Sequence, residues 1–272
     1  MLNVLLTNDD GIEAEGLQAM RTALLAVPGV NLAVIAPDGN RSAMARSITT
    51  RRPLWVAEVP FADATVGYAS DGTPVDCVRL ASLGLVEGFA PDLVVSGINH
   101  GANLGDDITY SGTVAAALEG VVLGIPAIAV SQQSGARALD FRYHGGFHFD
   151  IAASFVARLV ERIEDVPLPA TTLINVNVPA GEPTGVEVTS IGKRIYQDEL
   201  RLEREEEHGR RYWVYGSDPG FHDEPGTDLA AVAAGRIAVT PIHFDLTDRA
   251  GLEALQSFDL GELLGPVARE RS

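Results

Sequence analysis

Short apolar runs of strand length alternate with helical patterns along the first two thirds of this 272-residue chain. In the helical patterns, apolar residues recur at spacings of three and four. Such alternation predicts parallel strands in one sheet, with helices packed on both of its faces. We therefore expect an α/β fold, specifically a Rossmann-like three-layer α/β/α sandwich with a mainly parallel sheet. The expected strands are residues 2–6, 30–36, 91–99, 125–131 and 172–178, and the expected helices are residues 17–25, 75–86, 114–122 and 149–163.

The character of the chain changes near residue 183, so we expect a catalytic core over 1–182 and a C-terminal extension over 183–272. Charged residues dominate 193–211, and the aromatic run 212–215 follows as an expected strand. This pattern predicts a hairpin at about 190–216 with a charged tip. A two-stranded ribbon is marginal unless it packs on something, which favours an arm used in oligomerisation over a solvated loop. The extension is expected to end with a returning strand at 236–240 and a terminal helix at 252–264.

Composition excludes several classes of protein. The net charge of −17 argues against duplex nucleic acid as a partner, because neutralising phosphates needs clustered Lys and Arg. No apolar run approaches the roughly 18 residues that a membrane span needs. With a single cysteine, Cys77, and no basic leader at the N-terminus, a cytoplasmic location is the expectation.

The stretch Thr7-Asn8-Asp9-Asp10-Gly11 follows the first expected strand and precedes the first expected helix. It therefore places two adjacent carboxylates at the carboxyl edge of the sheet, where open α/β sheets bind their ligands. Because the carboxylates of Asp9 and Asp10 repel each other, a cation beside them is the functional interpretation. The alternative is an ordinary turn and helix start, which Asp and Gly both favour.

Two more loops are expected at the same edge. Residues 38–42 follow the second strand and include Ser42, which is a candidate nucleophile, a candidate metal ligand or an ordinary loop serine. The nucleophile interpretation is weak, since the chain has no Gly-x-Ser-x-Gly elbow. The strand at 91–99 ends in Ser96-Gly97-Ile98-Asn99, so Asn99 is expected at this edge too.

A glycine-rich loop at 100–107 leads to Tyr110-Ser111-Gly112-Thr113 and then to a helix. Backbone N–H groups and two hydroxyls would gather at a helix N-terminus, which is a natural site for phosphate. The segment lacks the Gly-Lys-Ser/Thr ending of a Walker motif. The alternative is simple capping of the helix by Ser111 or Thr113. Phosphate binding is the preferred interpretation, because capping does not explain the glycines and asparagines of the loop.

Taken together, these motifs resemble the SurE family of survival-protein nucleotidases. The resemblance rests on the order and spacing of several motifs over nearly the whole chain. They are Asn8-Asp9-Asp10-Gly11, Asn40-Arg41-Ser42, Gly-Thr-Pro-x-Asp-Cys-Val at 72–78, Ser96-Gly97-Ile98-Asn99, Gly-Asp-Asp…Tyr-Ser-Gly-Thr-Val at 105–114, Gly-Thr-Asp at 226–228 and Thr-Pro-Ile…Asp-Leu-Thr at 240–247.

The resemblance implies a metal-dependent phosphatase that acts on nucleoside 5′-monophosphates, in some members also on 3′-monophosphates and polyphosphate. It also implies a homodimer or homotetramer built through the C-terminal arm. Transferred to this sequence, the ligands of one divalent metal ion per subunit would be Asp9, Asp10, Ser42 and Asn99, with Asp9 and Asp10 also catalytic. The phosphate would be bound by Asn8, Asn99, Ser111, Gly112 and Thr113.

An all-oxygen ligand set of this kind suits Mg²⁺ or Mn²⁺ better than zinc. The expected reaction is in-line attack on phosphorus by a metal-activated water, with an aspartate, preferably Asp10, accepting the proton. The Ser111–Thr113 amides would stabilise negative charge on the phosphoryl oxygens. A phosphoaspartate formed by Asp9 is the alternative mechanism.

Two other functions remain open on the sequence alone. One is a nucleotide sensor that uses the same phosphate site without catalysis. The other is a metal-dependent nucleotide-sugar transferase, since paired aspartates can hold such a substrate through a metal. Release of phosphate from a nucleoside monophosphate, with and without a chelator, separates both from a nucleotidase.

Overall fold

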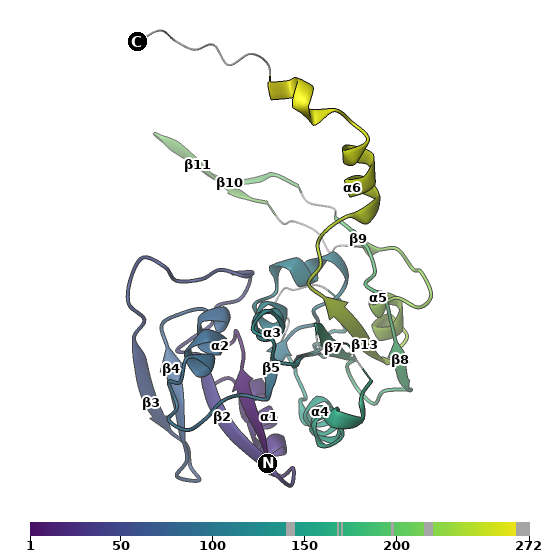
Figure 1. Ribbon diagram of the computed structural model, residues 1–272. Coiled ribbons are helices and arrows are strands. Elements are labelled where there is room, and N and C mark those ends of the chain that lie inside the picture. Colours follow the sequence, from purple (N-terminus) through teal and green to yellow (C-terminus); the bar gives the residue numbers. More distant parts are fainter. Residues whose placement is uncertain (140–144, 168, 170, 197–198, 215–219, 265–272) are drawn as a thin grey trace.

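The computed structural model describes residues 1–139, 145–167, 169, 171–196, 199–214 and 220–264. Within them, the centre is a nine-stranded sheet in the order β3-β4-β2-β1-β5-β6-β7-β13-β8 (Figure 1). The six neighbours from β4 to β7 pair in parallel, whereas β3 and β13 run antiparallel to β4 and β7. The strands of this sheet are β1 (Leu2–Thr7), β2 (Val30–Pro37), β3 (Val56–Pro60), β4 (Val66–Ser70), β5 (Leu93–His100), β6 (Ala127–Gln132), β7 (Thr172–Val178), β8 (Val186–Val188) and β13 (Ile237–His243).

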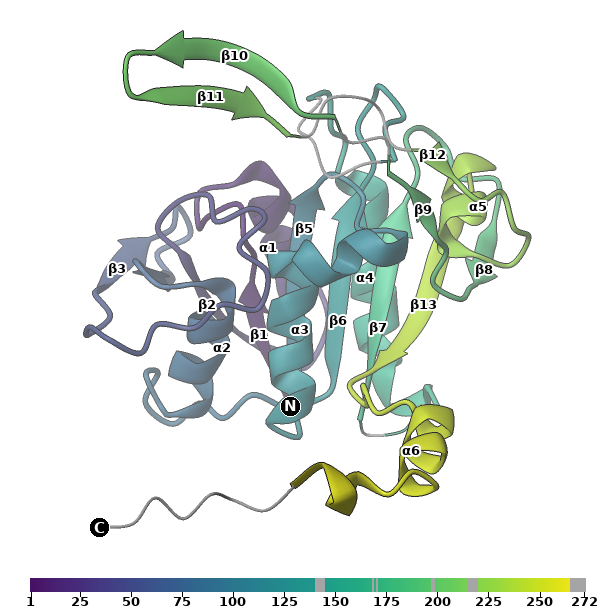
Figure 2. The ribbon, with the colours of Figure 1, turned by 90° about the horizontal axis from the view of Figure 1, so that it is seen from above.

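Helices cover both faces of the sheet, so the expected three-layer α/β/α sandwich is confirmed. Helices α1 (Glu15–Leu25) and α4 (Asp150–Glu161) bury one apolar cluster with the strands. Helices α2 (Pro74–Ser82) and α3 (Gly112–Val122) bury a second cluster on the opposite face (Figure 2). Near-continuous apolar strands such as β5 and β6 follow from this arrangement, since both of their faces are covered.

Helix α2 is shorter than the helix expected over 75–86: the expected C-terminal end at residue 86 was wrong. The helix ends at Ser82 because Gly84 adopts a positive φ of 89°. The Gly84 N–H then bonds to the Ala81 carbonyl, and the Leu85 N–H bonds to the Leu80 carbonyl. This is a Schellman C-cap, which satisfies the last carbonyls of the helix and turns the chain away.

Tight packing between α1 and β5 brings two of the site-bearing segments together. A Cβ atom on Gly16 would lie only 2.1 Å from the carbonyl oxygen of Ile98. Only a glycine allows this approach, so the first turn of α1 lies directly against the end of β5.

The C-terminal extension adds to the sheet of the core. Strand β13 pairs with β7, and β8 pairs in parallel with β13. Helix α5 (Asp228–Ala233) packs Leu229 and Val232 against Ala102 and Leu104 of the glycine-rich loop. The extension therefore supports the segment that leads into α3.

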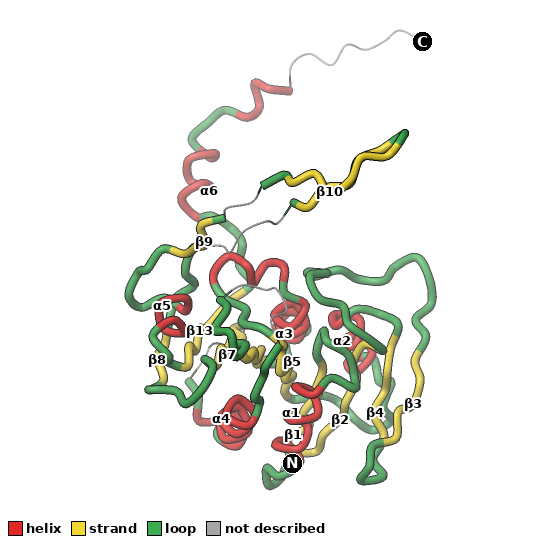
Figure 3. The backbone as a smooth tube through the Cα atoms, turned by 180° about the vertical axis from the view of Figure 1, so that it is seen from behind, coloured by secondary structure: helices red, strands yellow, loops and turns green. Residues whose placement is uncertain are grey.

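Two parts of the extension project from the body (Figures 1 and 3). The expected hairpin is present as β10 (Arg201–Glu206) and β11 (Gly209–Trp213). The expectation of a charged tip between two strands was wrong, because the charged residues form the strands themselves. Strand β11 begins at Gly209, before the aromatic run 212–215, of which Tyr215 lies outside the described residues. Every residue of both strands is exposed. A second small ribbon, β9 (Arg194–Ile195) with β12 (Gly220–Phe221), lies at the base of this hairpin.

The expected terminal helix is divided into two pieces. Helix α6 (Arg249–Gln256) is followed by a 3₁₀ helix, η3 (Leu260–Leu264). The break coincides with Asp259, whose side chain accepts a hydrogen bond from the Gly261 N–H at 3.0 Å and so competes with helical bonding. No residue of α6 is buried. Two further 3₁₀ helices are η1 (Gly105–Tyr110) and η2 (Ile163–Asp165).

Across the described part of the chain, no helix has both the length and the apolar character needed to cross a membrane.

Candidate active site

The site forms where three adjacent strands end. Because the sheet order is β2-β1-β5, the segments that follow β1 and β2 meet the end of β5 at one edge. A pocket of about 50 Å³ lies there, and Asp9, Ser42, Asn99 and Ser111 all line it. The structure thus brings together four side chains that are far apart in the sequence. The other lining residues are Ala43, His100, Asn103, Asp107 and Tyr110.

Asp9 is buried beneath the first turn of α3. The Thr113 hydroxyl donates a hydrogen bond to Asp9 Oδ1. A Cβ atom on Gly112 would lie 2.7 Å from the Asp9 Cβ, so residue 112 must be glycine for the helix to come this close. Burial raises the pKa of Asp9 to about 7, and the neighbouring Asp10 carboxylate adds to the rise.

Asp10 is held by the last residue of β5 and by the loop after β2. Its Oδ2 accepts a hydrogen bond from the His100 backbone N–H at 3.1 Å, and its Oδ1 accepts one from Asn40 Nδ2 at 3.2 Å. Burial raises the pKa of Asp10 to about 6. The His100 ring lies nearby, with Nδ1 3.6 Å from Asp10 Oδ1, and it packs against the rings of Phe147 and Phe149.

Asn40 links Asp10 to Ser42, and the sequence analysis gave it no role. Besides donating to Asp10, its Oδ1 accepts the Ser42 backbone N–H at 2.9 Å. The side chain of Asn40 therefore sets the positions of two expected metal ligands. Its place in Asn40-Arg41-Ser42, at the end of a strand, was the available signal, because Asn side chains often organise such turns.

Asn99 and Asn8 differ in what they can offer a ligand. Asn99 Nδ2 donates to the Gly101 carbonyl at 2.8 Å, which leaves its Oδ1 available as an acceptor or ligand. Asn8 hydrogen-bonds Gly11 through both of its side-chain polar atoms, at 2.9 and 3.1 Å. Asn8 builds the turn that carries Asp9 and Asp10, and it does not line the pocket.

At the start of α3, the capping interpretation is confirmed, whereas phosphate binding stays a prediction. Ser111 Oγ accepts a hydrogen bond from the Val114 N–H at 3.1 Å and so caps the helix. The N–H groups of Gly112 and Thr113 belong to the first turn and have no carbonyl partner within the helix. These two amides directly follow Ser111, which lines the pocket, and an anion bound at this positive end of the helix would be stabilised.

The donor set suits a divalent cation of the Mg²⁺ or Mn²⁺ type. The two adjacent carboxylates of Asp9 and Asp10 are buried, and both have raised pKa values. The positive charge near them is therefore too small to offset the cost of burying the ionised form. A serine hydroxyl and an amide oxygen complete an all-oxygen set, with Ser42 and Asn99 lining the same pocket as Asp9. The described residues contain no group of three or more His, Cys, Asp or Glu side chains arranged for a metal.

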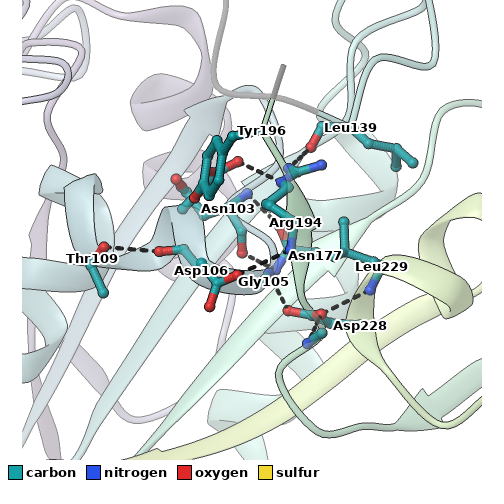
Figure 4. Close-up of polar contacts among 12 residues, drawn as sticks. Asn103, Gly105, Asp106, Thr109, Leu139, Asn177, Arg194, Tyr196, Asp228 and Leu229 are labelled. Carbon is teal, nitrogen blue, oxygen red and sulfur yellow. Dashed lines mark hydrogen bonds and ion pairs between the residues drawn. The ribbon is translucent and has the colours of Figure 1, made fainter. Parts of the chain in front are cut away.

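A second polar cluster that the sequence analysis missed lies on the wall of the pocket (Figure 4). Asp107, which lines the pocket, forms a fully buried ion pair with Arg194. Asp107 also accepts a hydrogen bond from the Tyr196 hydroxyl at 3.0 Å. No spacing in the sequence predicts this contact, because Arg194 and Tyr196 lie in the extension, nearly ninety residues from Asp107.

The fold and the site together define a class of protein. It is an α/β protein of the three-layer type with an acidic, oxygen-lined pocket beside a helix N-terminus. The family model "Survival protein SurE" matches residues 4–198. The chain is 53% identical to the 5′-nucleotidase SurE of Rubrobacter xylanophilus over 97% of this chain and 99% of that protein. It is 46% identical to the 5′-nucleotidase SurE of Geobacter sulfurreducens, over 95% and 94% of the two chains.

A solved structure agrees with these sequence matches. The crystal structure of the SurE protein from Aquifex aeolicus has a TM-score of 0.78 and 37% sequence identity, and it covers 93% of this chain and 98% of that one. The chain belongs to the SurE family.

Proposed function

We propose that this protein is a 5′-nucleotidase that hydrolyses nucleoside 5′-monophosphates to nucleoside and phosphate with the help of one divalent metal ion per subunit. The names of its relatives support the reaction. The single observation that carries the proposal is the contact of Asp9 with the first turn of α3, through Thr113 and Gly112. It supports the proposal because a carboxylate that would bind a cation lies directly beside amides that would bind an anion.

Asp9, Asp10, Ser42 and Asn99 would hold the metal. When bound, Mg²⁺ or Mn²⁺ would neutralise the two carboxylates, polarise a phosphoryl oxygen and make water more acidic. Without such a cation, a dianionic phosphomonoester would meet two buried carboxylates in a protein of net charge −17.

The residues of the chain then have separable roles. The Gly112 and Thr113 amides bind the phosphoryl oxygens and stabilise the charge that develops on them. Asp10 accepts a proton from the attacking water, and Asn40 and the His100 amide keep its carboxylate oriented. Thr113 holds Asp9 in one rotamer by donating to Oδ1. The pocket is small, about 50 Å³, so the proposal has it receive the phosphoryl group and the metal while the nucleoside lies outside.

The position of the nucleoside outside the pocket leads to a proposal about substrate range. The pocket holds the phosphoryl group and gives the sugar little steric constraint, so 3′-monophosphates and short polyphosphate should also be cleaved. Rates of phosphate release over a panel of 5′-monophosphates, 3′-monophosphates and tripolyphosphate test this. Cleavage of 5′-monophosphates alone would contradict the broader range.

Phosphate release from AMP, with Mn²⁺ and then with excess EDTA, tests the main proposal. Metal-dependent release that EDTA abolishes is the expected result. Nucleotide binding without release would instead identify a sensor, and release only in the presence of a sugar acceptor would identify a transferase.

The stereochemistry at phosphorus separates water attack from a phosphoaspartate on Asp9. We propose direct attack by water, a single in-line displacement. It would invert the configuration at phosphorus of a nucleoside phosphorothioate that carries one heavy oxygen isotope and is hydrolysed in water of another. Two successive displacements through Asp9 would retain the configuration, and retention would overturn the direct route.

We also propose that the extension, residues 183–272, joins subunits into a dimer or tetramer. Leu202, Tyr212 and Trp213 on the hairpin are exposed, as are Leu252 and Leu255 on α6. Large apolar side chains on two projecting elements are typical of a surface that another chain covers.

A further inference from the structure

The phosphate-binding turn at the start of α3 depends on η1, which immediately precedes it. The Ser111 N–H bonds to the carbonyl of Ile108 in η1 at 3.2 Å, so the two segments are joined without a flexible linker. Asp107 and Tyr110 of η1 line the same pocket as Asp9 and Asn99. A shift of η1 would therefore move the amides of Gly112 and Thr113 relative to Asp9.

Several of the polar contacts that hold η1 come from the C-terminal extension (Figure 4). The Gly105 N–H donates to Asp228 Oδ2 at 2.9 Å. The Arg194 backbone N–H donates to Asp106 Oδ2 at 3.0 Å, and Arg194 Nε donates to Asp107 Oδ2 at 2.6 Å. On the core side, the Ala45 N–H bonds to the Tyr110 carbonyl at 3.2 Å.

The ion pair between Arg194 and Asp107 is costly to bury. The side chains are 0% and 1% exposed, and desolvating two charges offsets much of their attraction. An apolar pair of similar volume would stabilise the fold about as well, so stability alone does not account for charges at this position. The pair has a local consequence: Arg194 neutralises a carboxylate on the wall of a pocket that must accept a phosphate.

Arg194 also lies at the base of the projecting hairpin. It is the first residue of β9, and β10 begins at Arg201. Its guanidinium donates to the Leu139 carbonyl as well, so one side chain joins η1, the segment before residue 140 and the base of the arm. Arg194 therefore contacts η1 directly and lies seven residues before the hairpin in the chain.

We propose that Arg194 is a positioning residue for the phosphate-binding turn. Through Asp106 and Asp107 it fixes the position of η1. It thereby sets the distance between the Gly112 and Thr113 amides and Asp9 that a bound phosphoryl group requires. This inference rests on the proposed nucleotidase function. It predicts that disturbing Arg194 weakens phosphate binding far more than metal binding, because three of the four proposed metal ligands have no hydrogen bond with the turn in the described part of the chain, and Asp9 itself lies on another segment.

The test uses the full-length protein and a double variant, Arg194→Met with Asp107→Asn, which removes both charges and leaves no buried charge unpaired. The expected result is a rise of about tenfold in KM for AMP and in the inhibition constant of inorganic phosphate. The dissociation constant for Mn²⁺, measured by titration calorimetry, should stay within twofold. The conservative variant Arg194→Lys keeps the charge and should give intermediate values.

Arg236→Met is the matched control. It breaks an ion pair with Glu187 that also belongs to the extension but lies on the exposed edge of the sheet, away from η1. Its KM for AMP should equal that of the wild type. Thermal unfolding of every variant checks that the fold is retained.

Three outcomes would overturn the inference. An unchanged KM in a folded double variant would show that Arg194 does not position the turn. A parallel loss of Mn²⁺ and phosphate affinity would show a general disturbance of the site. Equal loss in Arg236→Met would show a general effect of the extension. Failure of the wild type to release phosphate from AMP would instead refute the nucleotidase proposal, and calorimetric binding of inorganic phosphate with Mg²⁺ would still test the role of Arg194.

Discussion

At the scale of single residues, Asp9 and Asp10 are the groups on which the proposed chemistry depends. They are adjacent in sequence yet held differently, Asp9 by the Thr113 hydroxyl and Asp10 by Asn40 and the His100 amide. The two carboxylates therefore keep fixed and distinct orientations. A cation placed between them and the α3 amides would balance charges that the protein itself leaves unbalanced.

Asp9→Asn keeps the size of the side chain and its bond with Thr113 but replaces an anionic metal ligand with a neutral one. We expect turnover of AMP to fall by roughly 10³-fold or more, since a weakened metal site removes charge stabilisation from the transition state. The metal-free variant should unfold at a higher temperature than the metal-free wild type, because one of two repelling carboxylates is gone. Asp165→Asn, on an exposed ion pair with Arg162, is the control and should change neither quantity. Normal turnover in Asp9→Asn would refute the assignment of metal ligands.

The raised pKa of Asp9 predicts how the stability of the metal-free protein depends on pH. The folded-state pKa of about 7 lies above the ordinary value of 3.8, so between these limits the folded state binds more protons than the unfolded state. The contribution of Asp9 to stability is therefore greatest at low pH and is lost as pH rises toward 7. The free energy of unfolding of the wild type relative to Asp9→Asn, measured in EDTA, should fall across this range. A flat difference would show that Asp9 titrates normally.

At the scale of elements, the approach of α3 to β1 determines whether the site can form. The first turn of α3 lies over Asp9 at a distance that only a glycine at position 112 allows. Helix α1 is brought to the end of β5 in the same way, by Gly16. At Gly16 and at Gly112, the absence of a side chain thus lets the helix backbone approach the neighbouring segment closely.

Gly112→Ala should displace the first turn of α3 from Asp9, since the new Cβ would lie 2.7 Å from the Asp9 Cβ. A shift of about 1 Å in a catalytic constellation can cost on the order of 10² in rate, and we expect kcat/KM for AMP to fall by about that factor. Gly185→Ala is the control, because a Cβ there meets nothing within 4 Å. Retention of full activity by Gly112→Ala would mean that the turn can relax without affecting catalysis.

At the scale of the whole molecule, a compact α/β body carries two projecting elements whose apolar side chains are exposed. The hairpin β10–β11 has no buried residue, and neither has α6. A two-stranded ribbon is marginally stable by itself, so its persistence in the chain favours a partner surface. The connection from Arg194 to η1 would then make the phosphate site responsive to how that surface is engaged.

Leu255→Glu on α6 places a charge on the exposed apolar face, where the leucine is 57% exposed. We expect the oligomer of the wild type to dissociate partly or fully, because a charge buried at an interface costs several kcal/mol by general estimates. Light scattering coupled to gel filtration measures the mass. Leu83→Glu, at an exposed leucine just after α2, is the control and should leave the mass unchanged. A monomeric wild type would contradict the proposed role of the extension.

Much of this architecture was predictable from the sequence, because local patterns and motif order carry it. Strands such as β1 and β5 are mostly apolar, and burial on both faces favours that pattern. The pair Asp9-Asp10 and the segment Ser111-Gly112-Thr113 each follow a strand or precede a helix, so their place at the carboxyl edge could be predicted. The end of α2 could not be predicted from apolar spacing alone, because it depends on the positive φ of Gly84.

The sequence by itself determined the alternation of strands and helices, the edge of the sheet where polar residues collect and the family of the chain. Only the tertiary structure decided that Asn40 orients Asp10, that Gly112 lies against Asp9 and that Arg194 holds η1 through Asp107. The physical reason is the range of the interactions. Periodicity and turn chemistry act between near neighbours, whereas a buried ion pair or a close backbone approach depends on how distant segments pack.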